Sequence, residues 1–126
     1  MELRPAVPDD ADAVAAVHVA SWRAAYAGVL PAPVLAALSA AERAARWRDR
    51  LAPTRPSTTI VADDHGVVVG FASVGPSRDP DAPSPDTGQL HAIYVDPARW
   101  QTGVGRALFA AARDLASSRG HRTLTL

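Results

Sequence analysis

The sequence predicts an α/β protein of the α+β type, and three observations carry this prediction. Residues 58–62 and 67–74 are rich in β-branched side chains and flank a polar turn, which predicts an antiparallel hairpin. Residues 104–119 repeat apolar side chains at helical spacing. Residues 93–103 read as the end of a strand followed by a glycine-containing loop. The chain has 126 residues, within the usual range of one domain, so we expect residues 1–126 to form a single domain.

The N-terminal part predicts a short strand and a long helix. Residues 2–5 form the strand, and Asp9 or Asp10 is expected to cap a helix that runs to about Tyr26. The residues expected on the inner face of this helix are Val14 and Val17. Gly28 then ends the helical pattern, together with a nearby proline, Pro31.

Two shorter helices are expected next. A group of apolar residues marks the first of them: Val34, Leu35 and Leu38. Ser39 and Glu42 have the spacing of a capping box and start the second, which Pro53 ends. This second helix carries two large apolar side chains, Trp47 and Leu51.

The C-terminal half predicts three further strands and a helix. The hairpin turn is expected at residues 63–66, and the proline-rich segment 76–87 is predicted to be a mobile surface loop. Residues 89–95 form the next strand, which we expect at the centre of the sheet. The following helix ends at Gly120, a glycine C-cap, and residues 121–126 begin a fifth strand. The apolar residues that define this helix are Val104, Leu108, Ala111 and Leu115.

The loop between strand and helix predicts an anion site. Gly103 and Gly105 have no side chain, so successive backbone N–H groups can close around an anion beside the positive end of the helix dipole. A nucleotide P-loop is excluded because the chain contains no lysine. A dinucleotide fingerprint is excluded because Leu108 stands where the third glycine is required. The loop is therefore expected to hold a phosphate group of another kind.

The order of these motifs resembles the GNAT superfamily of acyl-CoA N-acyltransferases. The resemblance covers the opening Leu3-Arg4-Pro5-Ala6, the strand Gly88-Gln89-Leu90-His91-Ala92-Ile93-Tyr94-Val95-Asp96-Pro97, and the loop with Gly-x-Gly before Arg-Ala-Leu. It implies a mixed, mostly antiparallel central sheet flanked by helices. One position departs from the family pattern: Trp100 stands where the family usually has glutamine or arginine.

The resemblance also implies the chemistry. An amine would attack the thioester of acetyl-CoA directly in a ternary complex, and positioning of the two reactants would be the main catalytic contribution. The acceptor would be a small-molecule amine or a protein N-terminus. The pantetheine arm would lie along the central strand, and the diphosphate on the loop amides. The expected coenzyme-binding residues are Ile93, Tyr94, Val95, Gln101, Thr102, Gly103, Val104, Gly105 and Arg106.

Candidates for the remaining roles are few. His91 lies on the strand where the family often has a glutamate, and we predict it as general base, with a water relay or no protein base as alternatives. Trp22 and Tyr26 share a helix face that borders the family's acceptor site, so they are candidate substrate-binding residues, with core packing as the alternative. His18 is expected to be structural, and no metal constellation is visible in the sequence.

Composition limits the partners. Thirteen basic residues, all arginine, balance thirteen acidic ones, which gives no electrostatic reason to expect nucleic acid or a membrane as partner. The chain has no cysteine, which excludes thiolate catalysis and cysteine-based zinc sites. The N-terminal segment carries no long apolar run, and we therefore expect a cytoplasmic protein.

The last strand ends soon after it begins, whereas the family continues with a further helix and strands. We therefore expect a chain that is truncated at its C-terminus. Its uncovered strand edge favours self-association, and a homodimer is one expected form. The alternative function is a GNAT module that binds CoA without turnover.

Overall fold

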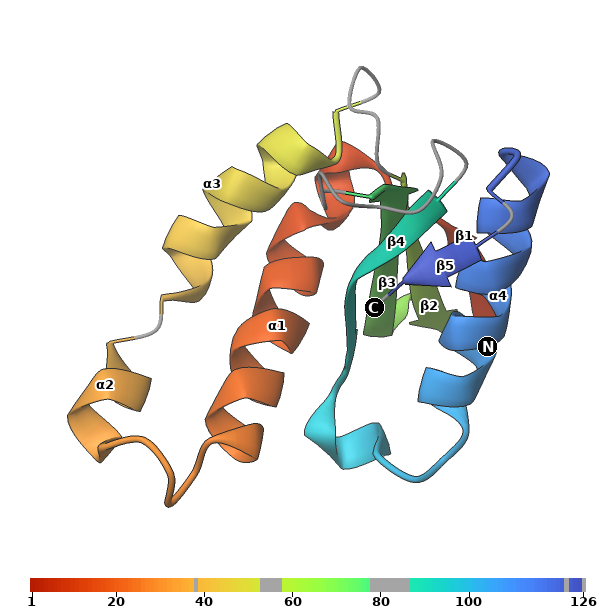
Figure 1. Cartoon of the computed structure of the whole chain (residues 1–126). Coiled ribbons are helices and arrows are strands. Elements are labelled where there is room, and N and C mark those ends of the chain that lie inside the picture. Colours follow the sequence, from red (N-terminus) through yellow and green to blue (C-terminus); the bar gives the residue numbers. More distant parts are fainter. Residues whose placement is uncertain (38, 53–57, 78–86, 122, 126) are drawn as a thin grey trace.

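The computed structural model describes residues 1–37, 39–52, 58–77, 87–121 and 123–125 (Figure 1). Its strands form one sheet in the order β1-β2-β3-β4-β5, antiparallel except for the parallel pair β4 and β5. The strands are β1 Glu2–Pro5, β2 Thr58–Asp64, β3 Val67–Pro76, β4 Thr87–Val95 and β5 Thr123–Thr125. The helices are α1 Ala11–Ala25, α2 Ala32–Ala36, α3 Ala40–Arg50 and α4 Val104–Ser118. This confirms the mixed, mostly antiparallel sheet flanked by helices.

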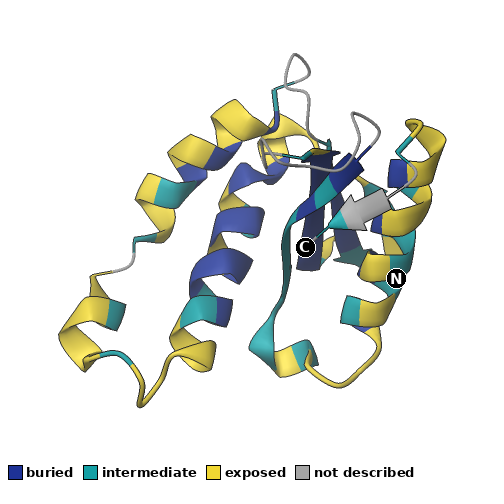
Figure 2. Cartoon of the chain, viewed as in Figure 1, coloured by how far each residue is buried: buried dark blue, intermediate teal, exposed yellow. Residues whose placement is uncertain are grey.

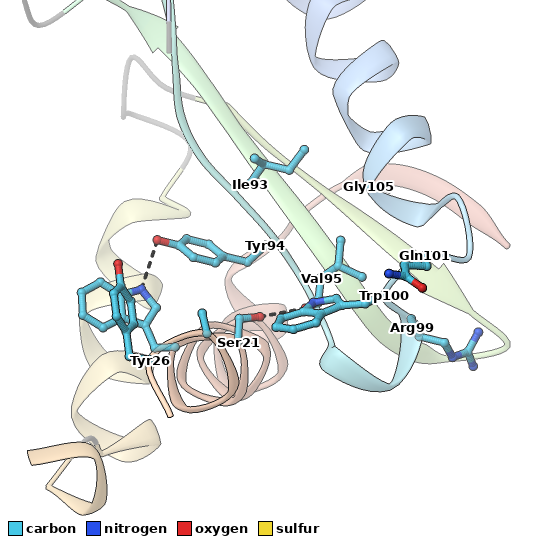
Figure 3. A pocket seen from close by; sticks show the side chains of 11 residues that line it. Ser21, Tyr26, Ile93, Tyr94, Val95, Arg99, Trp100, Gln101 and Gly105 are labelled. Carbon is cyan, nitrogen blue, oxygen red and sulfur yellow. Dashed lines mark hydrogen bonds between the residues drawn. The ribbon is translucent and has the colours of Figure 1, made fainter. Parts of the chain in front are cut away.

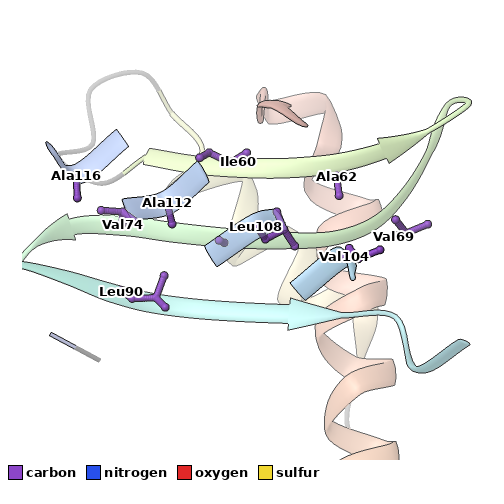
Figure 4. Close-up of a cluster of buried hydrophobic side chains, with 10 residues drawn as sticks. Ile60, Ala62, Val69, Val74, Leu90, Val104, Leu108, Ala112 and Ala116 are labelled. Atoms are coloured by element: carbon purple, nitrogen blue, oxygen red, sulfur yellow. The ribbon is translucent and has the colours of Figure 1, made fainter. Parts of the chain in front are cut away.

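The helices cover both faces of the sheet, so the protein has three layers (Figures 1 and 2). Helices α1 and α3 pack on one face, where Trp47 and Phe71 are buried together with Val14 and Val17. Helix α4 packs on the other face, where Leu108 lies against strand β3 (Figure 4). Side chains alternate across a strand, and for this reason β3 sends Phe71 to one layer and Ala72 to the other.

The N-terminus of α1 differs from the prediction in the role of its acidic residue. Asp10 stands at the N-cap position, but its side chain caps no helix amide. Its carboxylate instead lies 2.8 and 2.9 Å from the Arg4 guanidinium nitrogens and accepts a hydrogen bond from the Val7 amide. The hydrogen bonds from Arg4 lower the pKa of Asp10. Arg4 also bonds Asp63, so this cluster joins β1, β2 and the start of α1.

The hairpin turn is shorter than predicted. Strands β2 and β3 extend to Asp64 and from Val67, which leaves a turn of two residues, His65 and Gly66. Both have left-handed φ angles, 53° and 87°, and a turn of this kind matches the right-handed twist of the strands. Asp63 accepts a hydrogen bond from the Gly66 amide at 2.7 Å and closes the turn.

Strand β4 contains a β-bulge at His91. Ser73 of β3 pairs with Ala92, but the next residue, Val74, pairs with Leu90, so His91 is the extra residue. The bulge changes which residues face which layer. Leu90 packs in the α4 layer, yet Ala92, two residues on, packs in the α1 layer.

Other elements follow the prediction. Ser39 caps α3 by accepting a hydrogen bond from the Glu42 amide, and Gly120 follows α4 with a left-handed φ of 85°. Strand β4 lies between β3 and β5, whereas the middle position of the five is held by β3. Every helix among the described residues is too short or too polar to cross a lipid bilayer. Leu38, Pro53, Leu126 and most of the predicted loop at 76–87 lie outside the described residues; its two ends, Pro76 and Thr87, are strand residues.

Candidate active site

One cavity of about 460 Å³ joins α1, the end of β4 and the loop before α4 (Figure 3). It brings together seven of the residues predicted to bind the coenzyme or the substrate: Trp22, Tyr26, Ile93, Tyr94, Val95, Gln101 and Gly105. Four further residues complete the lining: Ser21, Ala25, Arg99 and Trp100. Segments about 70 residues apart in the sequence therefore form one wall of side chains and backbone.

The cavity lies beside the part of β4 that is not paired with β5. Strand β5 pairs with β4 only from Thr87 to Gln89, so in the described part of the chain the rest of β4 has a partner strand on one side only. The Asp96 amide bonds Val69 of β3, and alternation then turns the amide groups of Val95 and Ile93 to the open side. An extended ligand can therefore lie along this edge as an added strand would.

The Val95 carbonyl on this edge already has two donors. The Ser21 hydroxyl and the Trp100 indole N–H each donate to it at 2.8 Å. A carbonyl oxygen accepts two hydrogen bonds, so these side chains fill its capacity. The N–H groups of Ile93 and Val95 are left as the donors that face the open edge.

The loop before α4 has the backbone shape of an anion site. Gln101 and Gly103 adopt left-handed φ angles of 65° and 92°, and Gly103 is the N-cap residue of α4. A glycine cannot cap with a side chain, so the amides of the first helical turn face outward without a side-chain cap. An added Cβ at Gly103 would meet nothing within 4 Å, and Gln101, Thr102 and Gly103 are all exposed. The loop is therefore open to a ligand from solvent.

The aromatic residues divide into a buried and an accessible set. His18 and Trp47 are buried beside Phe71, with ring centroids 5.0–6.1 Å apart. Trp22 and Tyr26 line the cavity, and their ring centroids are 5.0 Å apart. The Trp22 indole N–H donates to the Tyr94 hydroxyl at 3.1 Å, which fixes the two rings across the gap between α1 and β4 (Figure 3). Trp22 is half-buried and Tyr26 is exposed, so the pair lines the cavity instead of lying fully in the core, and its role in binding the substrate stays a prediction.

His18 is a core residue, as expected. Burial lowers its pKa from 6.5 to about 4, and the nearby charges of Arg43 and Arg50 add to this. Its Nδ1 accepts a hydrogen bond from the Trp47 indole at 3.3 Å, so the proton of the neutral ring sits on Nε2. The ring is 4.6 Å from that of Tyr94 and supports the cavity wall from behind.

His91 is not among the residues that line the cavity. Its Nε2 lies 3.1 Å from the Pro76 carbonyl, to which it donates. The prediction placed His91 on the same face as Gln89 by regular alternation, and the bulge at His91 removes that basis. Its role as general base stays a prediction.

The remaining loop residues lie beside the cavity rather than in its wall. Val104 is buried in the core with its side chain, and Arg106 is exposed on the first turn of α4. The Thr102 hydroxyl donates to the Arg99 carbonyl and so shapes the loop. The coenzyme roles of these residues stay predictions, as do those of the predicted residues that line the cavity, and they concern mainly backbone amides.

Sequence reasoning missed part of the lining. Ser21 and Ala25 could have been found, because they share the helix face of Trp22 and Tyr26 at i, i+1, i+4 and i+5 spacing. Arg99 gave no such signal. It is held by an ion pair with Asp64 at 2.8 Å, and only the hairpin brings that carboxylate to the loop.

Comparisons with known proteins agree with this geometry. The pattern of the acetyltransferase (GNAT) family matches residues 19–126. An N-acetyltransferase of Bacillus subtilis, YuaI, described as uncharacterized, is 33% identical over 122 residues, covering 97% of this chain and 68% of its own. A GCN5-related N-acetyltransferase from Ralstonia eutropha has a TM-score of 0.75 at 27% identity, covering 99% of this chain and 82% of its own.

The PaiA N-acetyltransferase of Thermoplasma acidophilum, solved in complex with coenzyme A, shares the fold. Its TM-score is 0.75 at 18% identity, and the match covers 95% of this chain and 74% of the other. The family pattern, the relative and the fold lead to the same assignment. The chain is an acyltransferase that belongs to the acetyltransferase (GNAT) family.

Proposed function

We propose that this protein transfers the acetyl group of acetyl-CoA to a primary amine by direct attack in a ternary complex. The observation that carries the proposal is the cavity that joins an open strand edge to a glycine loop at a helix N-terminus. The two parts are suited to the two ends of the coenzyme. The strand edge suits the amide-bearing pantetheine arm, and the loop suits its diphosphate.

The loop end is where we place the diphosphate. The unbonded amides of the first turn of α4 supply donors, and the helix dipole adds partial positive charge. Gln101 and Gly105 line the cavity at this end, and Arg106 lies on the same turn as an exposed cation. The coenzyme would thus be held mostly by main chain.

The strand end is where we place the thioester. Because Ser21 and Trp100 already saturate the Val95 carbonyl, we expect the arm to bond the amides of Ile93 and Val95 instead. An N–H of this edge can also face the thioester oxygen as it gains negative charge during attack. The acetyl group then lies next to Tyr94, within reach of an amine that enters along α1.

The attacking amine must first lose a proton. The described lining contains no carboxylate and no histidine, so we propose that a water molecule in the open cavity takes it. The lack of a protein base in the described lining also supports the second candidate function, a module that binds CoA without turnover. His91→Gln tests the competing prediction of a protein base: a loss of kcat of about a hundredfold or more would support it.

The test is a pair of measurements on the same preparation. Calorimetry measures acetyl-CoA binding, and a thiol reagent measures CoA release with a panel of primary amines. Binding with amine-dependent release supports the enzyme, and binding without release supports the module. A folded protein that neither binds acetyl-CoA nor releases CoA refutes the proposal.

The single domain, cytoplasmic location and homodimer predicted from the sequence are carried here as proposals. Sedimentation velocity measures the oligomeric state, and cell fractionation measures the location. A single cooperative unfolding transition is expected for one domain.

A further inference from the structure

We propose that the acceptor is a monoamine with an apolar substituent, an arylalkylamine above all, bound against the rings of Trp22, Tyr26 and Tyr94. This inference rests on the proposed function, because it names the acceptor of the same cavity. Three steps support it: the position of these rings, their accessibility and the charge around them.

The residues that line the cavity form two ends, one at the loop before α4 and one at helix α1 (Figure 3). The loop end is formed by Arg99, Trp100, Gln101 and Gly105. The helix end is formed by Trp22, Ala25 and Tyr26, and the β4 residues lie between. With the diphosphate at the loop end and the thioester along β4, the helix end is the side left for the amine.

The rings at the helix end form a preformed apolar surface. Tyr26 keeps 38% of its surface exposed although its ring centroid lies only 5.0 Å from that of Trp22. The hydrogen bond from Trp22 to Tyr94 holds the third ring, and the buried His18 ring supports it from behind at 4.6 Å. Such a surface binds an aromatic or alkyl group at little cost in side-chain entropy.

The charges at this end disfavour a polycation. In the lining formed by described residues the one charged side chain is Arg99, which lies at the loop end and is paired with Asp64 at 2.8 Å, so it adds little positive charge at the helix end. The Arg43 guanidinium lies 5.8 Å from the centre of the Trp22 ring. A second ammonium group on the acceptor would meet this positive charge and find no carboxylate in the described wall. A monoamine avoids that repulsion and still offers its substituent to the rings.

The test compares three amines that differ in substituent and charge: phenethylamine, ethanolamine and spermidine. Calorimetry measures the binding of each to the CoA-loaded protein, and CoA release from acetyl-CoA gives KM and kcat. We expect phenethylamine to bind about tenfold or more tightly than the other two. In Tyr26→Ala the phenethylamine affinity should fall about fivefold, with the effect in KM rather than kcat, while ethanolamine is unaffected.

Two further variants complete the design. Trp22→Phe keeps a ring and should keep the preference for phenethylamine. Phe109→Ala removes an aromatic side chain of similar exposure, 40%, from α4 outside the cavity, and should change nothing. The proposal is overturned if spermidine or ethanolamine binds as tightly as phenethylamine, or if the preference for phenethylamine is undiminished in Tyr26→Ala.

Failure of the proposed function has a separate signature. If the proposed function is wrong, the unmodified protein does not bind acetyl-CoA, and this is measured before any amine is added. In that case the same three amines are titrated into the free protein. Tighter binding of phenethylamine than of ethanolamine and spermidine would then support the inference, and equal or weaker binding of phenethylamine would overturn it.

Discussion

The burial of His18 predicts a specific loss of stability in mild acid. The native pKa of His18 is about 4, whereas an unfolded histidine titrates near 6.5. The unfolded chain therefore takes up this proton first as the pH falls. The free energy of unfolding is at its full value above pH 6.5, decreases as the pH falls from 6.5 toward 4, and levels off below 4.

The magnitude follows from the two pKa values. Between pH 7 and pH 5 the unfolded histidine becomes almost fully protonated, and the native one remains almost fully neutral. The difference in proton binding corresponds to a loss of about 2 kcal/mol in the free energy of unfolding. This is a large share of the stability of a small domain. Asp10 and Asp64, whose pKa values are held low by Arg4 and Arg99, lose their stabilisation mainly at lower pH.

The assay is equilibrium unfolding in urea at pH 7, 6 and 5, with His18→Asn as the matched variant. An asparagine can still accept the hydrogen bond from the Trp47 indole but does not titrate. Subtracting the two pH profiles removes the contribution of all other groups. We expect the unmodified protein to lose about 2 kcal/mol more than the variant. Parallel profiles would show that His18 is solvated in the native state and would refute the reasoning.

Three further predictions concern the sheet and the coenzyme loop. In Gly70→Ala the added Cβ would lie 2.9 Å from a Leu108 methyl group, so urea unfolding should show a loss of about 1–3 kcal/mol, and an unchanged midpoint would contradict this packing. Gly103→Val and Gly105→Val should abolish acetyl-CoA binding in calorimetry, whereas Gly105→Ala, whose Cβ makes an ordinary contact at 3.6 Å, should retain it; near-normal affinity in both valine variants counts against the loop site. Trp100→Phe removes one hydrogen-bond donor from the Val95 carbonyl. If the freed oxygen then accepts a hydrogen bond from the coenzyme arm, acetyl-CoA should bind more tightly, with a Kd about three- to tenfold lower. A higher Kd would show that the indole supports the arm.

Much of the fold was predictable because its signals are local. The β-branched runs of the hairpin, the Ser39 cap and the apolar spacing of α4 each depend on residues close in sequence. The hairpin turn was nevertheless predicted two residues too long, since the strands extend to a turn whose left-handed residues are His65 and Gly66. Asp10 does stand at the predicted N-cap position, but its side chain makes no cap hydrogen bond, because Arg4 of β1 binds both oxygens of the carboxylate.

The candidate site also combines features that local sequence predicts with features that depend on distant residues. Gly103 and Gly105 by themselves predict an anion loop, because the lack of a side chain decides what the backbone there can do, and the open backbone at Gly103 is consistent with that prediction. Trp22 and Tyr26 were visible as a helix face, but a helix face alone does not say whether it meets the core or a cavity. That depends on which strand lies opposite.

The amino-acid sequence by itself determined the order of the elements and the family, both of which depend on short-range patterns and glycine positions. Only the tertiary structure decided what those elements surround. A one-residue bulge at His91 breaks the alternation that had placed this side chain on the face of Gln89. The short pairing of β4 with β5 leaves the edge that the cavity uses, and Ser21 and Trp100 meet at one carbonyl of that edge. These features depend on register and long-range contact, which no local periodicity encodes.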